Sequence, residues 1–231
     1  MSHETIYAWI WKDKQQGGSL WQCLRGARKR RRKRYGRYDS RGRLAGKKMI
    51  AERPAVVEER SRLGDWEIDT VHGSGKACVL TLVDRKSRLV RIGNLARATA
   101  LLASSKTIEL LGTELGRLHS ITGDNGSEFH SYKLIEQSLG LPFYFATPHH
   151  AWERGTNENT NGLLRQYLPK RTNLSAISQS QCSRIAEHLN SRPRKSLNFM
   201  TPNEVYYSIP VPSFSQSNPQ FNKGREQAPS P

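Results

Sequence analysis

The chain has 231 residues, of which 37 are Lys or Arg and 20 are Asp or Glu, so its formal net charge is +17. This size suits one hydrophobic core with accessory segments rather than two full domains. No stretch approaches the roughly 18 uncharged apolar residues of a spanning helix, so an integral membrane protein is excluded and no membrane partner is expected. The three cysteines are far apart in the sequence, which predicts neither a disulfide framework nor a zinc site. The N-terminus lacks a secretory pattern, and a cytoplasmic location is expected.

Residues 1–24 open with a helix pattern. Ser2 is a suitable N-cap, and Ile6, Trp9 and Ile10 follow at the spacing of one helical face. We therefore expect a short amphipathic helix at the start of the chain.

Residues 25–60 form a basic segment that we predict to be a linker. Thirteen Lys and Arg residues lie between positions 25 and 48, where Asp39 is the only acidic residue. Such a block repels itself and favours an extended or disordered arm that follows phosphates. A purely solvated spacer is the alternative. The densest run, our candidate for DNA binding, consists of Arg28, Lys29, Arg30, Arg31, Arg32, Lys33 and Arg34.

Residues 61–207 carry nearly all the periodic apolar pattern. Strand patterns occur at 66–71, 77–83, 88–95, 120–123 and 142–146. Helical patterns occur at 99–118, at 132–139, near 157 and at 178–190. This order predicts an α/β fold with a mixed five-stranded sheet flanked by helices. Residues 208–231, rich in Ser, Gln, Asn and Pro, predict a disordered tail.

Three carboxylates are candidates for a metal site, and an Asp inside a strand is both disfavoured and costly to bury unpaired. Asp69 lies inside a strand pattern, Asp124 follows a strand directly, and Glu158 is near the start of a helix. Each alone reads as a cap or turn residue. Together, in a chain whose charge favours phosphates, they match the carboxylates that hold two divalent cations in nucleases and polymerases.

The sequence around these residues resembles a known family. GDWEIDTV at 64–71, ITGDNGSEF at 121–129 and ATPHHAWERGTNENTNGLLRQY at 146–167 look like motifs of the IS thirty family of bacterial DDE transposases. The 33 residues between Asp124 and Glu158 match that family's spacing, and RPRK at 192–195 and TPNE at 201–204 resemble its C-terminal motifs. The resemblance runs from about residue 2 to residue 207.

This resemblance implies a fold and an activity. The fold would be RNase H-like, of the retroviral-integrase type, and Asp69, Asp124 and Glu158 would be the catalytic triad that binds two Mg²⁺ or Mn²⁺ ions. The activity would be cleavage and strand transfer of an insertion-sequence element. The partners would be double-stranded DNA, at the element's ends and at the target, and further copies of the chain in an active homo-oligomer. The protein would act in the bacterial cytoplasm, at the nucleoid.

The chain departs from the family pattern in two places. Its first residues, SHETIY, resemble the late helix of the family's helix-turn-helix region, so we expect 1–24 to be a remnant of an N-terminally shortened DNA-binding region. In addition, Asp65 and Ile68 stand where the family has His and Gly. Asp65 and Glu67 share the strand face of Asp69 and are rival candidates for its role.

Other polar residues near Glu158 have two interpretations. Arg154, Arg165 and Lys170 are candidates for DNA contact, with a solvated helix face as the alternative. Asn157, Asn159 and Asn161 are expected to cap the helix and to orient Glu158. His149 and His150 fit phosphate contact or a structural role equally well.

Two alternative functions remain at this point. One is a related integrase or nuclease that uses the same triad. The other is a catalytically silent remnant that binds DNA without cutting it.

Overall fold

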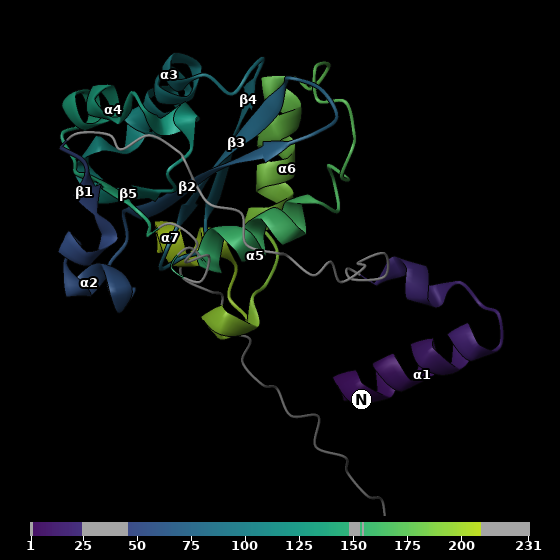
Figure 1. The fold of residues 1–231 in the computed structure, drawn as a ribbon. Helices are drawn as coiled ribbons and strands as arrows, with labels where there is room; N and C mark the ends of the chain where they lie inside the picture. The colour runs from purple at the N-terminus through teal and green to yellow at the C-terminus, as the bar shows by residue number, and fades with distance from the viewer. Residues whose placement is uncertain (1, 25–45, 148–152, 154, 209–231) are drawn as a thin grey trace, which may run out of the picture.

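The computed structural model describes residues 2–24, 46–147, 153 and 155–208. A six-stranded sheet forms its centre, in the order β1-β6-β5-β2-β3-β4 (Figure 1). The strands are β1 (Lys48–Met49), β2 (Asp65–His72), β3 (Cys78–Asp84), β4 (Val90–Leu95), β5 (Ser120–Gly123) and β6 (Phe143–Phe145). The first four in spatial order run parallel, whereas β3 and β4 continue the sheet antiparallel.

Helices cover both faces of this sheet. The α-helices are α1 (His3–Gln15), α2 (Ala55–Glu58), α3 (Ala100–Leu111), α4 (Tyr132–Leu139), α5 (Gly155–Leu164), α6 (Gln179–Asn190) and α7 (Pro202–Tyr207). Short 3₁₀ turns are η1 (Leu20–Cys23), η2 (Ile50–Glu52), η3 (Gly112–Arg117), η4 (Ser127–Phe129) and η6 (Lys195–Leu197). Among the described residues, none of these helices has the length and apolar character needed to cross a bilayer.

Two hydrophobic clusters hold the helices on the sheet. Trp66 and Ile68 belong to the cluster that includes residues of α3 and α4, whereas Val79 and Val83 belong to the cluster that includes residues of α5 and α6. Figure 1 shows these helices on the sheet. Strand β3 is buried along its whole length and contributes to both clusters. Burial on both faces explains why its sequence is a nearly continuous apolar run rather than an alternating one.

The predicted α/β sheet is present, with one strand more than the five expected. Strand β1 comes from the end of the segment that we predicted to be a linker, and it pairs with β6 through Lys48↔Tyr144 and Met49↔Phe145. Helix α2 follows, and its Val57 side chain is 0% exposed. Residues 46–60 therefore belong to the folded body, which corrects the linker boundary at residue 60. Strand β1 has only two residues, the exposed Lys48 and the half-buried Met49, which is too short to give a periodic signal.

The helix predicted over residues 99–118 is shorter than expected. Thr99 caps α3, which ends at Leu111, and η3 continues the chain. The helix packs through small and medium side chains such as Ala103 and Thr107, and Leu101 is 63% exposed. Leu111, at the end of the helix, is also buried, whereas Leu102 is 41% exposed, so the buried face consists mainly of small and medium side chains.

The N-terminal helix forms as predicted. The Ser2 hydroxyl accepts a hydrogen bond from the Thr5 backbone N–H, as an N-cap does. Helix α1 buries none of its residues and packs against η1. The predicted arm at 28–34 and the predicted tail from residue 209 onward lie outside the described residues.

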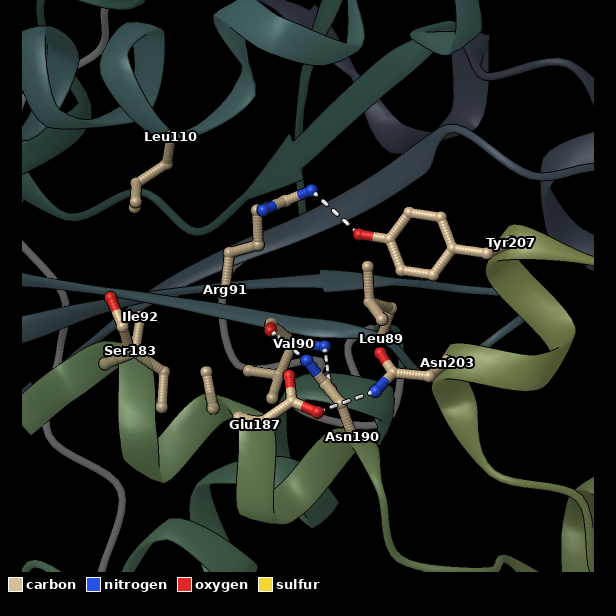
Figure 2. A pocket seen from close by; sticks show the side chains of 11 residues that line it. Leu89, Val90, Arg91, Ile92, Leu110, Ser183, Glu187, Asn190, Asn203 and Tyr207 are labelled. Carbon is tan, nitrogen blue, oxygen red and sulfur yellow. Dashed lines mark hydrogen bonds between the residues drawn. The ribbon is translucent and has the colours of Figure 1, made fainter. Parts of the chain in front are cut away.

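Side chains of α6 satisfy the outer edge of strand β4. The Asn190 amide donates to the Val90 carbonyl oxygen at 2.9 Å and accepts from the Val90 N–H at 2.8 Å (Figure 2). Three turns earlier, the Gln179 amide donates to the Ile92 carbonyl and accepts from the Asn94 N–H. These amides take the place of a neighbouring strand and cover an edge that would otherwise be open to pairing. A cavity of about 430 Å³ lies beside them, between β4, α3, α6 and α7.

Replacing Asn190 with Leu is expected to destabilise the fold by about 2–4 kcal/mol, since it leaves two buried backbone groups of Val90 without partners. Urea denaturation measures this loss as a lower midpoint at an unchanged slope. Ser183→Ala, on the same helix and lining the same cavity, is the matched control and should stay within about 0.5 kcal/mol of the parent. Equal midpoints for the two variants would contradict this role of Asn190.

Candidate active site at the ends of strands β2 and β5

The sheet register aligns the carboxylates that the sequence singled out. Strands β2 and β5 are parallel neighbours paired as Asp65↔Ser120, Trp66↔Ile121 and Glu67↔Thr122. The same offset, continued by two residues, puts Asp69 opposite Asp124, immediately beyond the end of β5. Residues two apart on a strand point to the same face. Asp69 therefore shares the sheet face of Glu67, and Asp124 lies just beyond the end of the neighbouring strand.

The rival carboxylate Asp65 is engaged within the fold. It is 2% exposed and accepts hydrogen bonds from Arg62 Nε at 2.8 Å and from Ser120 Oγ at 2.6 Å. The contact with Asp65 raises the pKa of Arg62 above its ordinary value. These bonds give Asp65 a structural role at the start of β2.

The second rival, Glu67, is also engaged within the fold. Its side chain is 0% exposed and forms an ion pair with Arg85, whose side chain is 1% exposed. Its other carboxylate oxygen, Oε2, accepts from the Asn157 backbone N–H at 2.9 Å. Of the three β2 carboxylates, Asp69 alone is half-buried rather than buried, which supports its assignment to the site.

Asp69 faces helix α5. Its Oδ1 accepts from the Thr70 backbone N–H at 2.9 Å, and its Oδ2 accepts from Asn161 Nδ2 at 2.8 Å. The Asn161 amide oxygen in turn accepts from the Thr81 hydroxyl on β3. Asn161 was expected to cap α5 and orient Glu158, but it lies inside the helix and holds Asp69 instead.

Asp124 lies in the turn that follows β5. Its Oδ1 accepts from the Gly126 backbone N–H at 2.9 Å, so the carboxylate stabilises its own turn. The neighbouring Asn125 donates from its amide to the Ala146 carbonyl and accepts from Lys47 Nζ. The turn is thereby fixed to the end of β6.

Glu128 is a further carboxylate at this turn, and the sequence reasoning missed it. A Cβ added to Gly126 would lie 2.5 Å from Glu128 Oε2 and 2.9 Å from Asp124 Oδ1, so the two carboxylates flank the same backbone position. The Thr70 hydroxyl, next to Asp69, donates to Glu128 Oε1 at 2.8 Å. Its place within ITGDNGSEF, four residues after Asp124, was the available signal.

Glu158 projects from the first turn of α5 and is exposed. It is adjacent to Asn157, which contacts Glu67, and precedes by three residues Asn161, which contacts Asp69. Helix α5 packs on β2 and β3, so the structure brings the helix that carries Glu158 onto the strand that carries Asp69 (Figure 1).

The three predicted ligands are not gathered into a closed metal centre. Within the described ranges, no three His, Cys, Asp or Glu side chains are grouped closely enough to hold an ion. The donor chemistry nonetheless fits, because carboxylate oxygens are the ligands that Mg²⁺ prefers. Asp69 and Asp124 provide such oxygens from neighbouring strands, and the exposed Glu158 carries a third carboxylate on the helix that contacts Asp69.

The cationic candidates fall into different environments. Arg165 is half-buried and donates to the carbonyl oxygens of His72 and Leu168, and burial lowers its pKa. Its guanidinium thus connects α5 to the end of β2, which favours a structural role. Lys170 is exposed. Arg154, His149, His150 and the Arg28–Arg34 run lie outside the described residues.

Curated relatives of the chain are insertion-sequence transposases. It is 44% identical over 210 residues to the transposase for insertion sequence element IS4351 of Bacteroides fragilis, covering 90% of this chain and 64% of the relative. It is 40% identical over 215 residues to the transposase for IS1086 of Cupriavidus metallidurans, covering 90% and 63%. It is 42% identical over 159 residues to transposase InsI for IS30A of Escherichia coli K12, covering 68% and 41%. The chain spans less than two thirds of the length of these relatives. No protein-family model matches it.

A solved structure supports the fold. A chain of the simian T-cell lymphotropic virus intasome, determined in complex with PP2A regulatory subunit B56 gamma, matches with a TM-score of 0.54 at 22% identity, covering 68% of this chain and 59% of that one. The integrase-like, RNase H-type α/β fold expected from the motifs is thereby confirmed, as is the family resemblance.

Proposed function

The chain is a homologue of IS thirty family insertion-sequence transposases, and from this we propose that it catalyses metal-dependent cleavage and strand transfer of DNA at the ends of such an element. The observation that carries the proposal is the placement of Asp69 and Asp124 on neighbouring parallel strands, Asp69 within β2 and Asp124 just beyond β5, with Asp69 hydrogen-bonded to the helix that bears Glu158. Ligand sites in open α/β sheets lie at this carboxyl end of the strands.

In this proposal Asp69, Asp124 and Glu158 hold the divalent cations. Two Mg²⁺ or Mn²⁺ ions bound there would activate the attacking oxygen and stabilise the charge on the transferring phosphate. Neighbouring side chains hold these carboxylates in place: Asn161 donates to the Asp69 carboxylate, and the contact of Asn125 with Ala146 fixes the turn of Asp124. In cleavage, water would attack the scissile phosphate and the bond to the 3′ oxygen of the element's end would break, leaving a 3′-hydroxyl. That hydroxyl would then attack a phosphate of target DNA in line and displace the 3′ oxygen of the target strand, with no covalent bond to the protein.

We further propose that double-stranded DNA is the partner and that several copies of the chain act together in the cytoplasm. Support comes from the net charge of +17 and from the assembly named for the matched viral structure, an intasome. The arm at 28–34 and Lys170 are the proposed phosphate contacts. Arg154, four residues before Glu158 in the sequence, is a further candidate.

Cleavage of duplexes tests the proposal against the silent-remnant alternative. The 231-residue chain is incubated with DNA that carries the element's terminal repeats, with Mg²⁺ or with EDTA. We expect nicking and joining that depend on Mg²⁺. A chain that binds these duplexes in the same buffer and leaves them intact at every Mg²⁺ and Mn²⁺ concentration would instead be a DNA-binding remnant.

A further inference from the structure

Helix α5 is tied to strand β2 at two points that match in spacing. The Asn157 backbone N–H donates to Glu67 Oε2 at 2.9 Å, and Asn161 Nδ2 donates to Asp69 Oδ2 at 2.8 Å. Four residues of helix rise about 6 Å, and two residues of strand advance about 6.6 Å. The two spacings are similar, and each contact joins one residue of α5 to one β2 carboxylate.

Glu67 can accept from the helix because its charge is compensated on the other side. Arg85 Nη1 contacts Glu67 Oε1 at 2.5 Å, and both side chains are fully buried. Arg85 is itself held by the Val57 carbonyl, which accepts from its Nε at 3.0 Å. An unpaired buried carboxylate would be strongly disfavoured, so Arg85 allows Oε2 to serve the helix.

The first turn of α5 needs such an acceptor. The first backbone N–H groups of a helix have no partner inside it, and a negative charge near them is favourable. Glu67, on strand β2, supplies both the hydrogen-bond acceptor and the negative charge, and it does so at Asn157, the residue that precedes Glu158. Arg88 adds a second anchor, because its Nη1 donates to the Thr156 hydroxyl at 2.8 Å.

We propose that Glu67 is a positioning residue: it fixes the first turn of α5, and with it Glu158, relative to Asp69. The effect of Glu67 on catalysis rests on the proposed function, whereas its hydrogen bond to Asn157 does not depend on that function. The arrangement explains why a fully buried charge stands two residues from the proposed metal ligand Asp69. Glu67 neither touches substrate nor holds an ion in this account.

Two double variants separate the helix contact from the buried charge. Glu67→Gln with Arg85→Gln removes both charges and keeps an amide oxygen that can accept from Asn157. Glu67→Met with Arg85→Met removes the same charges, keeps similar volume and offers no acceptor. Replacing a buried ion pair with apolar residues of similar volume is often neutral or stabilising, so neither variant is expected to lose its fold.

Hydrogen exchange measures the contact directly in the full chain. The amides of the first turn of α5 should exchange faster in the Met pair than in the Gln pair, while the amides of β3 stay equally protected in both. The cleavage rate per folded molecule should fall about 10- to 100-fold in the Met pair and less than about threefold in the Gln pair. DNA affinity and melting temperature should not differ between the two double variants in the way that their cleavage rates do.

Equal exchange and equal rates in the two double variants would overturn the inference. If the Met pair does not fold, Glu67→Asp with Arg85 retained is the second test, since its shorter side chain keeps the charge but withdraws from Asn157. It should show the same faster exchange and slower cleavage, and parent-like values would again overturn the role. If the parent chain does not cleave DNA, the proposed function fails, and hydrogen exchange alone then decides the contact.

Discussion

Asp69→Asn is expected to reduce Mg²⁺-dependent DNA cleavage by about 10³-fold or more, because an amide keeps the shape of the carboxylate but loses the charge that holds the cations. A loss of about 4 kcal/mol of transition-state stabilisation corresponds to this factor. Single-turnover cleavage of a labelled duplex measures it. DNA affinity should change less than about threefold, since the phosphate contacts proposed above lie elsewhere. Asp124→Asn and Glu158→Gln should behave in the same way.

Asp65→Asn is the matched control for this prediction. It removes the same charge from the same strand face, four residues away, where the carboxylate is engaged by Arg62 and Ser120. We expect a less stable protein whose cleavage rate per folded molecule is close to that of the parent. Normal cleavage by Asp69→Asn together with loss in Asp65→Asn would show that the first-strand ligand has been misassigned.

Replacing all seven residues from Arg28 to Arg34 with Ser should abolish most of the salt dependence of DNA binding. If about six of these cations contact phosphates, the slope of log K against log salt is about −5 in the parent. The parent would then lose roughly 10³-fold in affinity between 50 and 200 mM salt, and the Ser variant far less. Fluorescence anisotropy with one duplex at several salt concentrations provides the slopes.

A charge-retaining variant controls for the change of residue type. Changing the five arginines of this run to Lys preserves seven cations and should preserve the slope. Affinity in the Ser variant should fall alike for end-repeat and scrambled duplexes, because phosphate contacts carry no sequence information. An unchanged slope in the Ser variant would mean that the run is only a spacer.

The central sheet was predictable because its strands are buried and apolar. Strand β3 is a continuous hydrophobic run, and Asp124 follows β5 directly in the sequence, so the place of this turn at the strand end followed from local pattern. The motif resemblance was needed to assign Asp69 and Glu158 to one site, because they lie on different elements and no local sequence pattern connects them.

The contacts that hold the site together were not predictable in the same way. The partner of Glu67 is the backbone of Asn157, 90 residues later, and the partner of Asp69 is Asn161, 92 residues later. Whether a side chain caps a helix or holds a distant residue depends on the partner that the fold places next to it, and residue type alone does not specify this partner. For the same reason Arg165, which resembled a DNA contact, is engaged with the carbonyl of His72.

Diffraction from crystals of the chain soaked in Mn²⁺ tests the central claim most directly, because anomalous peaks locate the ions without reference to activity. We predict one or two peaks bound by the carboxylates of Asp69 and Asp124, with Glu158 turned toward them. Peaks bound by Asp65 or Glu67 would contradict the proposed metal site. The absence of any peak at Asp69 and Asp124 after complete soaking would contradict it as well.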